Sequence, residues 1–276
     1  MRKHNQVLGL HAQPNQKTNI ILLLIPFILL LAVYLTASHI RHQENQQDKL
    51  LPSAEQIVDA VDRVAFTEDR RTGKYLLWAD TLSSLKRLGI GIAAAAIVGL
   101  LLGLNMGVYP GFRSLSLSFV TFFSMIPPLA ILPIIFISFG VDEFAKIMLI
   151  FIGIFPMISR DIYLAVRKLP QEQITKALTL GASSFGVTYR IILPQITPRL
   201  IDAIRLSLGA AWLFLIASEA IAAMDGLGYR IFLVRRYLAM DVIIPYVLWI
   251  TLLGFIFDLI LRTIITKWFS WYDSSK

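Results

Sequence analysis

The sequence predicts an all-α membrane protein with six transmembrane helices. Three observations lead to this prediction. The 276-residue chain is 56% hydrophobic, with a mean hydropathy of +0.67. Its apolar residues gather in long uncharged runs, and a membrane-spanning helix needs about 20 such residues in a row. Its Lys and Arg residues lie mostly between those runs, as membrane insertion requires.

The first run, residues 20–37, predicts a transmembrane helix over residues 20–38. Its apolar core is longer than the roughly 7–15 residues of a cleaved signal peptide, so we expect it to remain in the protein. Residues 1–19 contain three basic residues and no acid. Because positive charge favours the cytoplasmic side, these residues are expected to form a cytoplasmic tail.

Residues 39–80 form the longest polar segment, which this topology places outside the membrane. Ser53 and Gln56 have the spacing of a helix capping box. Three apolar residues then recur at helical spacing: Ile57, Val61 and Val64. We expect an amphipathic helix on the outer surface, either as a contact for an extracytoplasmic partner or as a spacer on the membrane.

The next two runs, 88–108 and 115–139, open a core transmembrane domain over residues 81–262. The first carries glycines at every fourth position, which permit another helix to approach its backbone closely. The second contains prolines, which remove backbone donors and kink a helix. Such breaks can line a transport pathway, although a permanent structural kink is the alternative. The pathway residues predicted here are Ser124, Met125, Pro127 and Pro128.

The fourth run, 147–159, reaches span length only if Glu143 and Lys146 lie at the outer interface. The sixth run, 242–261, is followed by a cytoplasmic tail over residues 263–276. Near the end of that run Asp258 and Arg262 stand four residues apart, so an ion pair on one helix face is expected. Asp202 and Arg205, three residues apart, are a similar case and are expected near the cytoplasmic interface, where the fifth run begins.

Glu219 lies inside the fifth run, 204–224, which is otherwise apolar. A charge at the bilayer centre costs about 2.5–3.5 kcal/mol, so this side chain must face protein or water, or be protonated. We include Glu219 in the predicted pathway. A role in holding the helix through hydrogen bonds is equally compatible with its position.

Several chemistries are excluded by the sequence. The chain has no Cys, and its four His residues all lie within the first 42 positions. No G-x-x-x-x-G-K-[ST] or H-E-x-x-H pattern occurs. We therefore predict no catalytic residues, no metal site and no cofactor in this chain. The net charge of +8 follows from the basic loops of a membrane protein, so no nucleic-acid partner is expected.

The polar segment 160–199 contains Thr175-Lys176-Ala177-Leu178, then Gly181-Ala182-Ser183, and an Ile-x-Leu-Pro sequence that ends at Pro194. This pattern resembles the EAA loop of permease subunits in ATP-binding-cassette (ABC) importers. Further short matches over roughly residues 50–270 resemble the nitrate, sulfonate and taurine branch of that family. They include Pro127-Pro128 and Ser218-Glu219, with Gly226-Leu227-Gly228 following the latter.

The resemblance implies a type I ABC importer permease fold with a cytoplasmic coupling helix. It also implies that seven residues contact the ATPase: Thr175, Lys176, Ala177, Leu178, Gly181, Ala182 and Ser183. Thr175 stands where the family has Glu, so an ionic contact from that position is not expected. We expect two short helices joined at Gly181, which needs either a special backbone angle or a close approach. Pro194 and Pro198 are expected to end the second helix before the next span.

The function implied by the resemblance is ATP-driven import of a small solute, such as a sulfonate, nitrate or a related anion. The implied partners are two ATPase subunits that bind ATP and Mg, a second permease copy, an extracytoplasmic solute-binding protein and membrane lipid. The location is the bacterial cytoplasmic (inner) membrane, with both termini cytoplasmic. The alternative is an ion-coupled secondary transporter that works without an ATPase.

Overall fold

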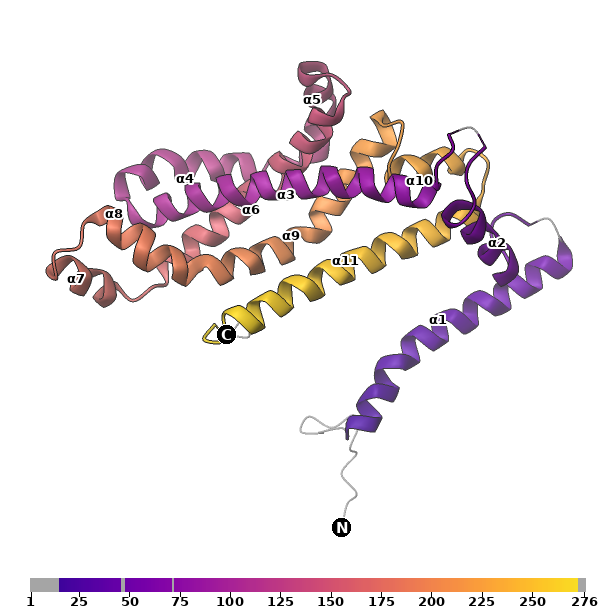
Figure 1. The fold of residues 1–276 in the computed structure, drawn as a ribbon, viewed down its shortest axis with the longest axis horizontal. Coiled ribbons are helices and arrows are strands. Elements are labelled where there is room, and N and C mark those ends of the chain that lie inside the picture. Colours follow the sequence, from indigo (N-terminus) through magenta and orange to yellow (C-terminus); the bar gives the residue numbers. More distant parts are fainter. Residues whose placement is uncertain (1–14, 46–47, 71, 273–276) are drawn as a thin grey trace, which may run out of the picture.

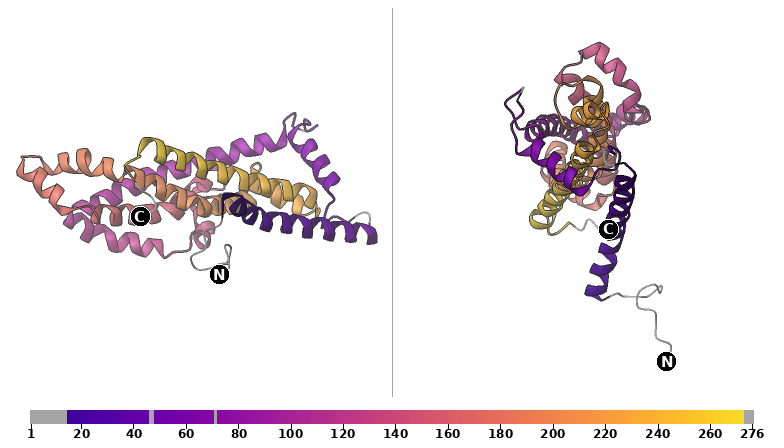
Figure 2. Two further views of the ribbon diagram at one scale, coloured as in Figure 1. Left: turned by 90° about the horizontal axis from the view of Figure 1, so that it is seen from below. Right: turned by 90° about the vertical axis from the view of Figure 1, so that its right-hand side faces the viewer.

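The structure, a computed structural model, describes residues 15–45, 48–70 and 72–272, and within these ranges every regular element is a helix (Figure 1). This agrees with the predicted all-α class. The helices form one elongated bundle from which the first helix projects (Figure 2). Residues 1–14 of the predicted N-terminal tail and residues 273–276 of the predicted C-terminal tail lie outside the described part.

Helix α1, Gln16–Glu44, extends the predicted first span at both ends. None of its most apolar 18-residue stretch is buried, and Figures 1 and 2 show it leaning away from the other helices. Its second half contacts the segment that follows it in the chain. There the hydroxyl of Tyr34 donates to the Pro52 carbonyl at 2.8 Å. A helix this apolar on every side belongs in lipid or against another protein.

Helix α2, Ala54–Ala65, is the predicted amphipathic helix. Its capping box is formed: the Ser53 N–H donates to Gln56 Oε1 at 2.9 Å, and the Gln56 N–H donates to Ser53 Oγ at 3.2 Å. Val64 is buried on the face that packs toward α11 and α3. The helix is therefore fastened to the bundle along one side.

Helix α3, Leu76–Val108, begins well before the predicted start at residue 88 and packs along α6, Glu143–Arg167. Its glycines make this contact possible. A Cβ added at Gly103 would lie 2.6 Å from the Ser159 carbonyl oxygen, and one at Gly107 would lie 2.5 Å from Val166. Because the two backbones are this close, α3 and α6 form the rigid centre of the bundle.

The predicted third span, 115–139, is a corner and not a kinked helix. Helix α4, Pro110–Ser124, is followed by the 3-10 turn η1, Pro128–Ile131, and by α5, Leu132–Phe139. The two parts are bent by 84°. The break lies at the predicted prolines, since neither Pro127 nor Pro128 has an N–H to continue the helix. Within the described residues, five helices are long and apolar enough to span a membrane, or six if this bent pair counts as one.

Helix α7, Gln171–Thr179, and the short α8, Ser184–Gly186, form the predicted helix–turn–helix. The prediction that prolines end the second helix is wrong. The chain continues through a π-helical segment η2, Val187–Ile192, directly into α9, Leu193–Ala222. Pro194 follows the wide turns of η2, and Pro198 is buried inside α9.

Helix α10, Leu227–Arg235, is followed by the last span α11, Met240–Trp268. The predicted pair of Asp258 with Arg262 is wrong: Asp258 Oδ1 accepts from Arg205 Nε at 2.9 Å. Helix α9 packs against α11, and this packing brings the guanidinium of Arg205 to the carboxylate of Asp258. The other predicted pair is confirmed, because Arg205 Nη1 also donates to Asp202 Oδ1 at 2.9 Å.

Candidate functional site

The coupling loop, residues 171–192, projects from one end of the bundle (Figure 1). Helix α7 ends in a Schellman turn, in which the Ala182 N–H donates to the Ala177 carbonyl and the Gly181 N–H donates to the Leu178 carbonyl, both at 3.0 Å. Gly181 has a φ of +86°, a conformation that glycine adopts without steric penalty. A Cβ there would meet no atom within 4 Å. Backbone angle, and not close approach within this chain, therefore requires the glycine.

Ser183 starts the second helix of the loop, because its Oγ accepts a 3.1 Å hydrogen bond from the Gly186 N–H. The predicted coupling residues divide by exposure. Two are half-buried and pack against the apolar core: Ala177 and Ala182. Five are exposed: Thr175, Lys176, Leu178, Gly181 and Ser183. The alanines fasten the loop to the bundle, and the exposed residues form its outer surface.

Two exposed apolar residues of this surface were missed at the sequence level. Leu180 is 88% exposed and Phe185 is 69% exposed. Phe185 also lines a shallow groove of about 400 Å³, together with Ala182, Ser183, Gly186, Arg190 and Ile191. Large apolar side chains next to a turn glycine were the available signal. Each presents apolar surface at a polar end of the molecule, as expected of a protein contact.

The loop is also anchored to Tyr109, the residue between α3 and α4. The hydroxyls of Thr188 and Tyr109 are 3.1 Å apart and form a hydrogen bond. Thr188 is fully buried, as are Val187 and Ile192 of the same segment. The end of the coupling loop at residues 187–192 is therefore packed into the bundle, while its turn at Leu180 is exposed.

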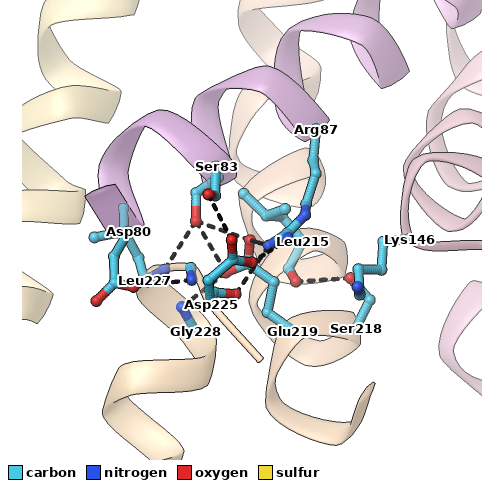
Figure 3. Close-up of polar contacts among 12 residues, drawn as sticks. Asp80, Ser83, Arg87, Lys146, Leu215, Ser218, Glu219, Asp225, Leu227 and Gly228 are labelled. Atoms are coloured by element: carbon cyan, nitrogen blue, oxygen red, sulfur yellow. Dashed lines mark hydrogen bonds and ion pairs between the residues drawn. The ribbon is translucent and has the colours of Figure 1, made fainter. Parts of the chain in front are cut away.

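At the opposite end of the bundle, Arg87 of α3 binds three carboxylates from different elements. Its Nη1 donates to Glu219 Oε1 at 2.7 Å, and its Nε donates to Glu143 Oε2 at 2.6 Å. Its Nη2 also donates to Asp225, as Figure 3 shows. Arg87 is 2% exposed and Glu219 is 0% exposed, whereas Glu143 and Asp225 are each more than half exposed. We call these four residues the Arg87 cluster.

Glu219 is satisfied by further donors (Figure 3). Its carboxylate accepts from Ser84 Oγ at 2.8 Å and from the Gly228 N–H at 2.8 Å. Of the two roles left open by the sequence, these contacts favour holding the helix. The partners were missed because Ser84 and Arg87 lie on α3, far away in the chain. An arginine next to Lys86 at the start of an apolar run was the signal that could have pointed to them.

Asp80 extends this polar end toward α10 and α11. It is 1% exposed and accepts from Arg230 Nε at 2.8 Å and from the Tyr246 hydroxyl at 3.1 Å. It also accepts from the Gly226 N–H at 3.1 Å. Two side chains of α3, Asp80 and Arg87, thus bind the turn between α9 and α10.

Asp225 lies in this turn, outside the spans. Burial raises the pKa of its carboxyl, but hydrogen bonds from Arg87 and Ser83 lower that pKa by more, so the net pKa is below its usual range. Asp225 therefore stays ionised at neutral pH and keeps its charge opposite Arg87.

The predicted pathway residues do not share one surface. Met125 is 73% exposed and Pro127 is exposed, both at the corner between α4 and η1. Ser124 and Pro128 are half-buried there, and Ser124 Oγ donates to the Thr121 carbonyl at 2.7 Å. Glu219 is enclosed in the Arg87 cluster instead. A pathway role for the corner remains a prediction.

In the described part of the chain, no group of three or more His, Cys, Asp or Glu side chains has the arrangement of a metal site. The two described histidines lie near the end of α1, where the His42 ring contacts the Ser38 carbonyl and Gln56 Oε1. The buried charges of the Arg87 cluster, Arg87 and Glu219, pair with one another.

Known proteins are similar to this chain. The taurine transport system permease protein TauC of Escherichia coli is 33% identical over 196 residues, which are 71% of each chain. The bicarbonate transport system permease protein CmpB of Synechococcus elongatus is 29% identical over 67% of this chain and 66% of its own. Among solved structures, an inward-facing form of the MetNI methionine ABC transporter matches with a TM-score of 0.57 at 22% identity. That match covers 69% of this chain and 96% of the MetNI chain.

The MetNI match shows that the predicted type I importer permease fold is correct. The sequence profile of the binding-protein-dependent transport system inner membrane component matches residues 90–269. This range includes the coupling loop and most of the helices around it. The chain therefore belongs to this family of multi-pass inner membrane proteins and is the permease component of an ABC importer, not an enzyme.

Proposed function

We propose that this permease imports a small anion of the sulfonate, nitrate or bicarbonate class, delivered by an extracytoplasmic binding protein. The names of the relatives support this substrate class, since TauC is described as a taurine permease and CmpB as a bicarbonate permease. At about 30% identity, substrate can differ between relatives. The binding protein, and not this chain, is expected to select the solute.

The coupling loop is proposed as the docking site for the ATPase. The observation that supports this role is a firmly anchored helix–turn–helix that presents Leu180 and Phe185 to solvent at a polar end of the bundle. One chain offers one such loop, whereas a pair of ATPase subunits needs two. We therefore propose that two copies of this chain assemble with two ATPase subunits.

In the proposed cycle the ATPase subunits bind ATP and Mg, close on each other and draw the two coupling loops together. The bundles then rock between inward-open and outward-open states. Both termini are proposed to be cytoplasmic, because the start of α1 and the end of α11 point toward the side of the coupling loop (Figure 1). The corner at Met125 and Pro127 is proposed to line the pathway between the two copies.

The test of the coupling loop is a matched pair of substitutions, Gly181→Asp and Gly181→Asn. Both side chains have the same size, and both residues tolerate positive φ better than most. Gly181→Asp adds a charge at the centre of the proposed contact, where single residues are worth about 2 kcal/mol or more. We expect Gly181→Asp to insert normally but to lose ATPase co-purification and transport. Gly181→Asn should retain more of both.

Wild-type co-purification and transport from Gly181→Asp would show that the loop is not the ATPase contact.

The substrate is tested separately, by measuring uptake of taurine, nitrate and bicarbonate into vesicles with the cognate binding protein. Uptake that persists after the ATPase is removed would support an ion-coupled carrier instead.

A further inference from the structure

The segment that joins the coupling loop to the transmembrane bundle is a π-helix. In η2 the Leu193 N–H donates to the carbonyl of Thr188, five residues back and not four. Such segments are rare, and inside an α-helix they act as one inserted residue. The 39-residue helix from Ser184 to Ala222 therefore contains a shift of helical register between its cytoplasmic start and its membrane-spanning part.

Pro194 explains why the wide register is stable here. In an uninterrupted α-helix the carbonyl of Arg190 would accept from the N–H of residue 194, but proline has no N–H. The proline ring would also clash with that carbonyl. An α-helical register through residues 187–192 thus gains no hydrogen bond at this position, and the wider turn relieves the clash.

Buried contacts then select the wide register. Val187 and Ile192 are 2% and 1% exposed, and Thr188 is 0% exposed with its hydroxyl bonded to Tyr109. On the other side of η2, α9 is fixed to α6 by the hydrogen bond from Arg199 Nε to Asp161 Oδ2 at 2.6 Å. Because both sides are held, the register of η2 determines how the coupling loop is turned relative to the bundle.

The size of this effect follows from helix geometry. Each residue of an α-helix turns the chain by about 100° and advances it by about 1.5 Å. Removing the extra residue of η2 would turn Phe185 and Leu180 by about that angle around the axis of α9. A docking patch turned so far would no longer face the same partner surface.

We propose that Pro194 is a positioning residue: by holding η2 in the π-helical register, it sets the direction in which the coupling loop presents Leu180 and Phe185 to the ATPase. This inference rests on the proposed role of the loop. Pro198 is the internal comparison, because it lies one turn further along, in an α-helical stretch, and carries no register shift.

The experiment compares three variants. Pro194→Ala restores the missing N–H and allows the α-helical register. The same substitution combined with deletion of the exposed Arg190 removes the extra residue, so an ordinary α-helix returns the loop to its native direction. Pro198→Ala is the control for loss of a proline in the same helix.

The first measurement uses the purified permease without the ATPase. The chain has no cysteine, so spin labels can be placed specifically with Leu180→Cys and Trp268→Cys, at sites that are 88% and 78% exposed. We expect Pro194→Ala to shift the distance between the labels by several ångström. The deletion variant should restore the native distance, and Pro198→Ala should leave it unchanged.

The second measurement is ATP hydrolysis and solute uptake by the reconstituted complex with the binding protein. Pro194→Ala should lose the stimulation of hydrolysis by the binding protein, and the deletion variant should recover it, which a merely structural defect would not allow. An unchanged label distance in Pro194→Ala would overturn the proposal, as would failure of the deletion to rescue. A shifted distance with normal coupling would instead contradict the role of the loop and leave the register assignment intact.

Discussion

The two ends of the bundle differ in which side chains they bury: one buries charged groups, and the other exposes apolar groups. At the Arg87 cluster, charged groups are buried, and Arg87 and Glu219 are together almost inaccessible to solvent. At the coupling loop, apolar groups are exposed, with Leu180 and Phe185 facing out. Burying charge is costly unless every group is paired, so the first end is fixed by its own contacts. Exposing apolar surface is unfavourable unless a partner covers it, so the second end is available for binding.

Two glycines show the same difference in the backbone. Gly226 and Gly181 have positive φ angles of +110° and +86°. A Cβ at Gly226 would lie 2.5 Å from Glu219 Oε1 and 2.7 Å from Arg87 Nη1, whereas one at Gly181 would meet nothing within 4 Å. Both turns need a glycine because each has a positive φ. Only at Gly226 is the space that a side chain would occupy already taken by other residues of the chain.

The largest effect is expected from Arg87→Met, because it leaves the buried Glu219 without its cation. Removing one partner of a buried pair costs about 3–5 kcal/mol of unfolding free energy, which denaturant titration in detergent would measure. The control is Arg63→Met, since Arg63 is 63% exposed in its pair with Asp241 and such surface pairs are worth about 0–1 kcal/mol. Equal losses from the two variants would show that burial does not distinguish the Arg87 cluster.

An intermediate effect is expected when alanine replaces each of the two turn glycines. Both variants pay about 1–2 kcal/mol for placing a side chain at positive φ. Gly226→Ala additionally pushes into Glu219 and Arg87, and such overpacking costs about 1–3 kcal/mol more. Thermal unfolding of the two purified variants gives the difference. A Gly226→Ala variant no less stable than Gly181→Ala would mean that the side chains of the Arg87 cluster can move aside for the added methyl group at little energetic cost.

The smallest effect on stability is expected from Leu180→Ser at the coupling loop. A surface substitution of this kind changes the unfolding free energy by about 0.5 kcal/mol or less. The ATPase should nevertheless co-purify with it poorly, because the proposed contact loses its most exposed apolar side chain. Val58→Ser is the matched control, since Val58 is 65% exposed on α2 near the other end. Co-purification without the binding protein should be normal for Val58→Ser; a similar loss from both would point to a general assembly defect.

Much of the architecture could be predicted because it depends on local pattern. Run length located five of the six predicted spans, the spacing of Ser53 and Gln56 located α2, and Gly181 located the turn of the coupling loop. These features obey rules that act within a few residues, such as capping, glycine conformation and the length needed to cross a bilayer. The family could be recognised for the same reason, because its motif is short and continuous.

What only the tertiary structure decided is which distant groups meet. Glu219 was visible as a buried charge, but its partner Arg87 lies on another helix, and Asp258 binds Arg205 of α9 and not Arg262 of its own helix. The continuation of α8 through η2 into α9 was also hidden, because proline normally ends a helix, whereas here a wide turn precedes Pro194 and packing around Thr188 helps to hold it. Sequence thus determined most of the spans, helix α2 and the turn at Gly181. The pairing of charges and the register of the coupling loop came from packing, where the energy of each contact depends on residues far away in the chain.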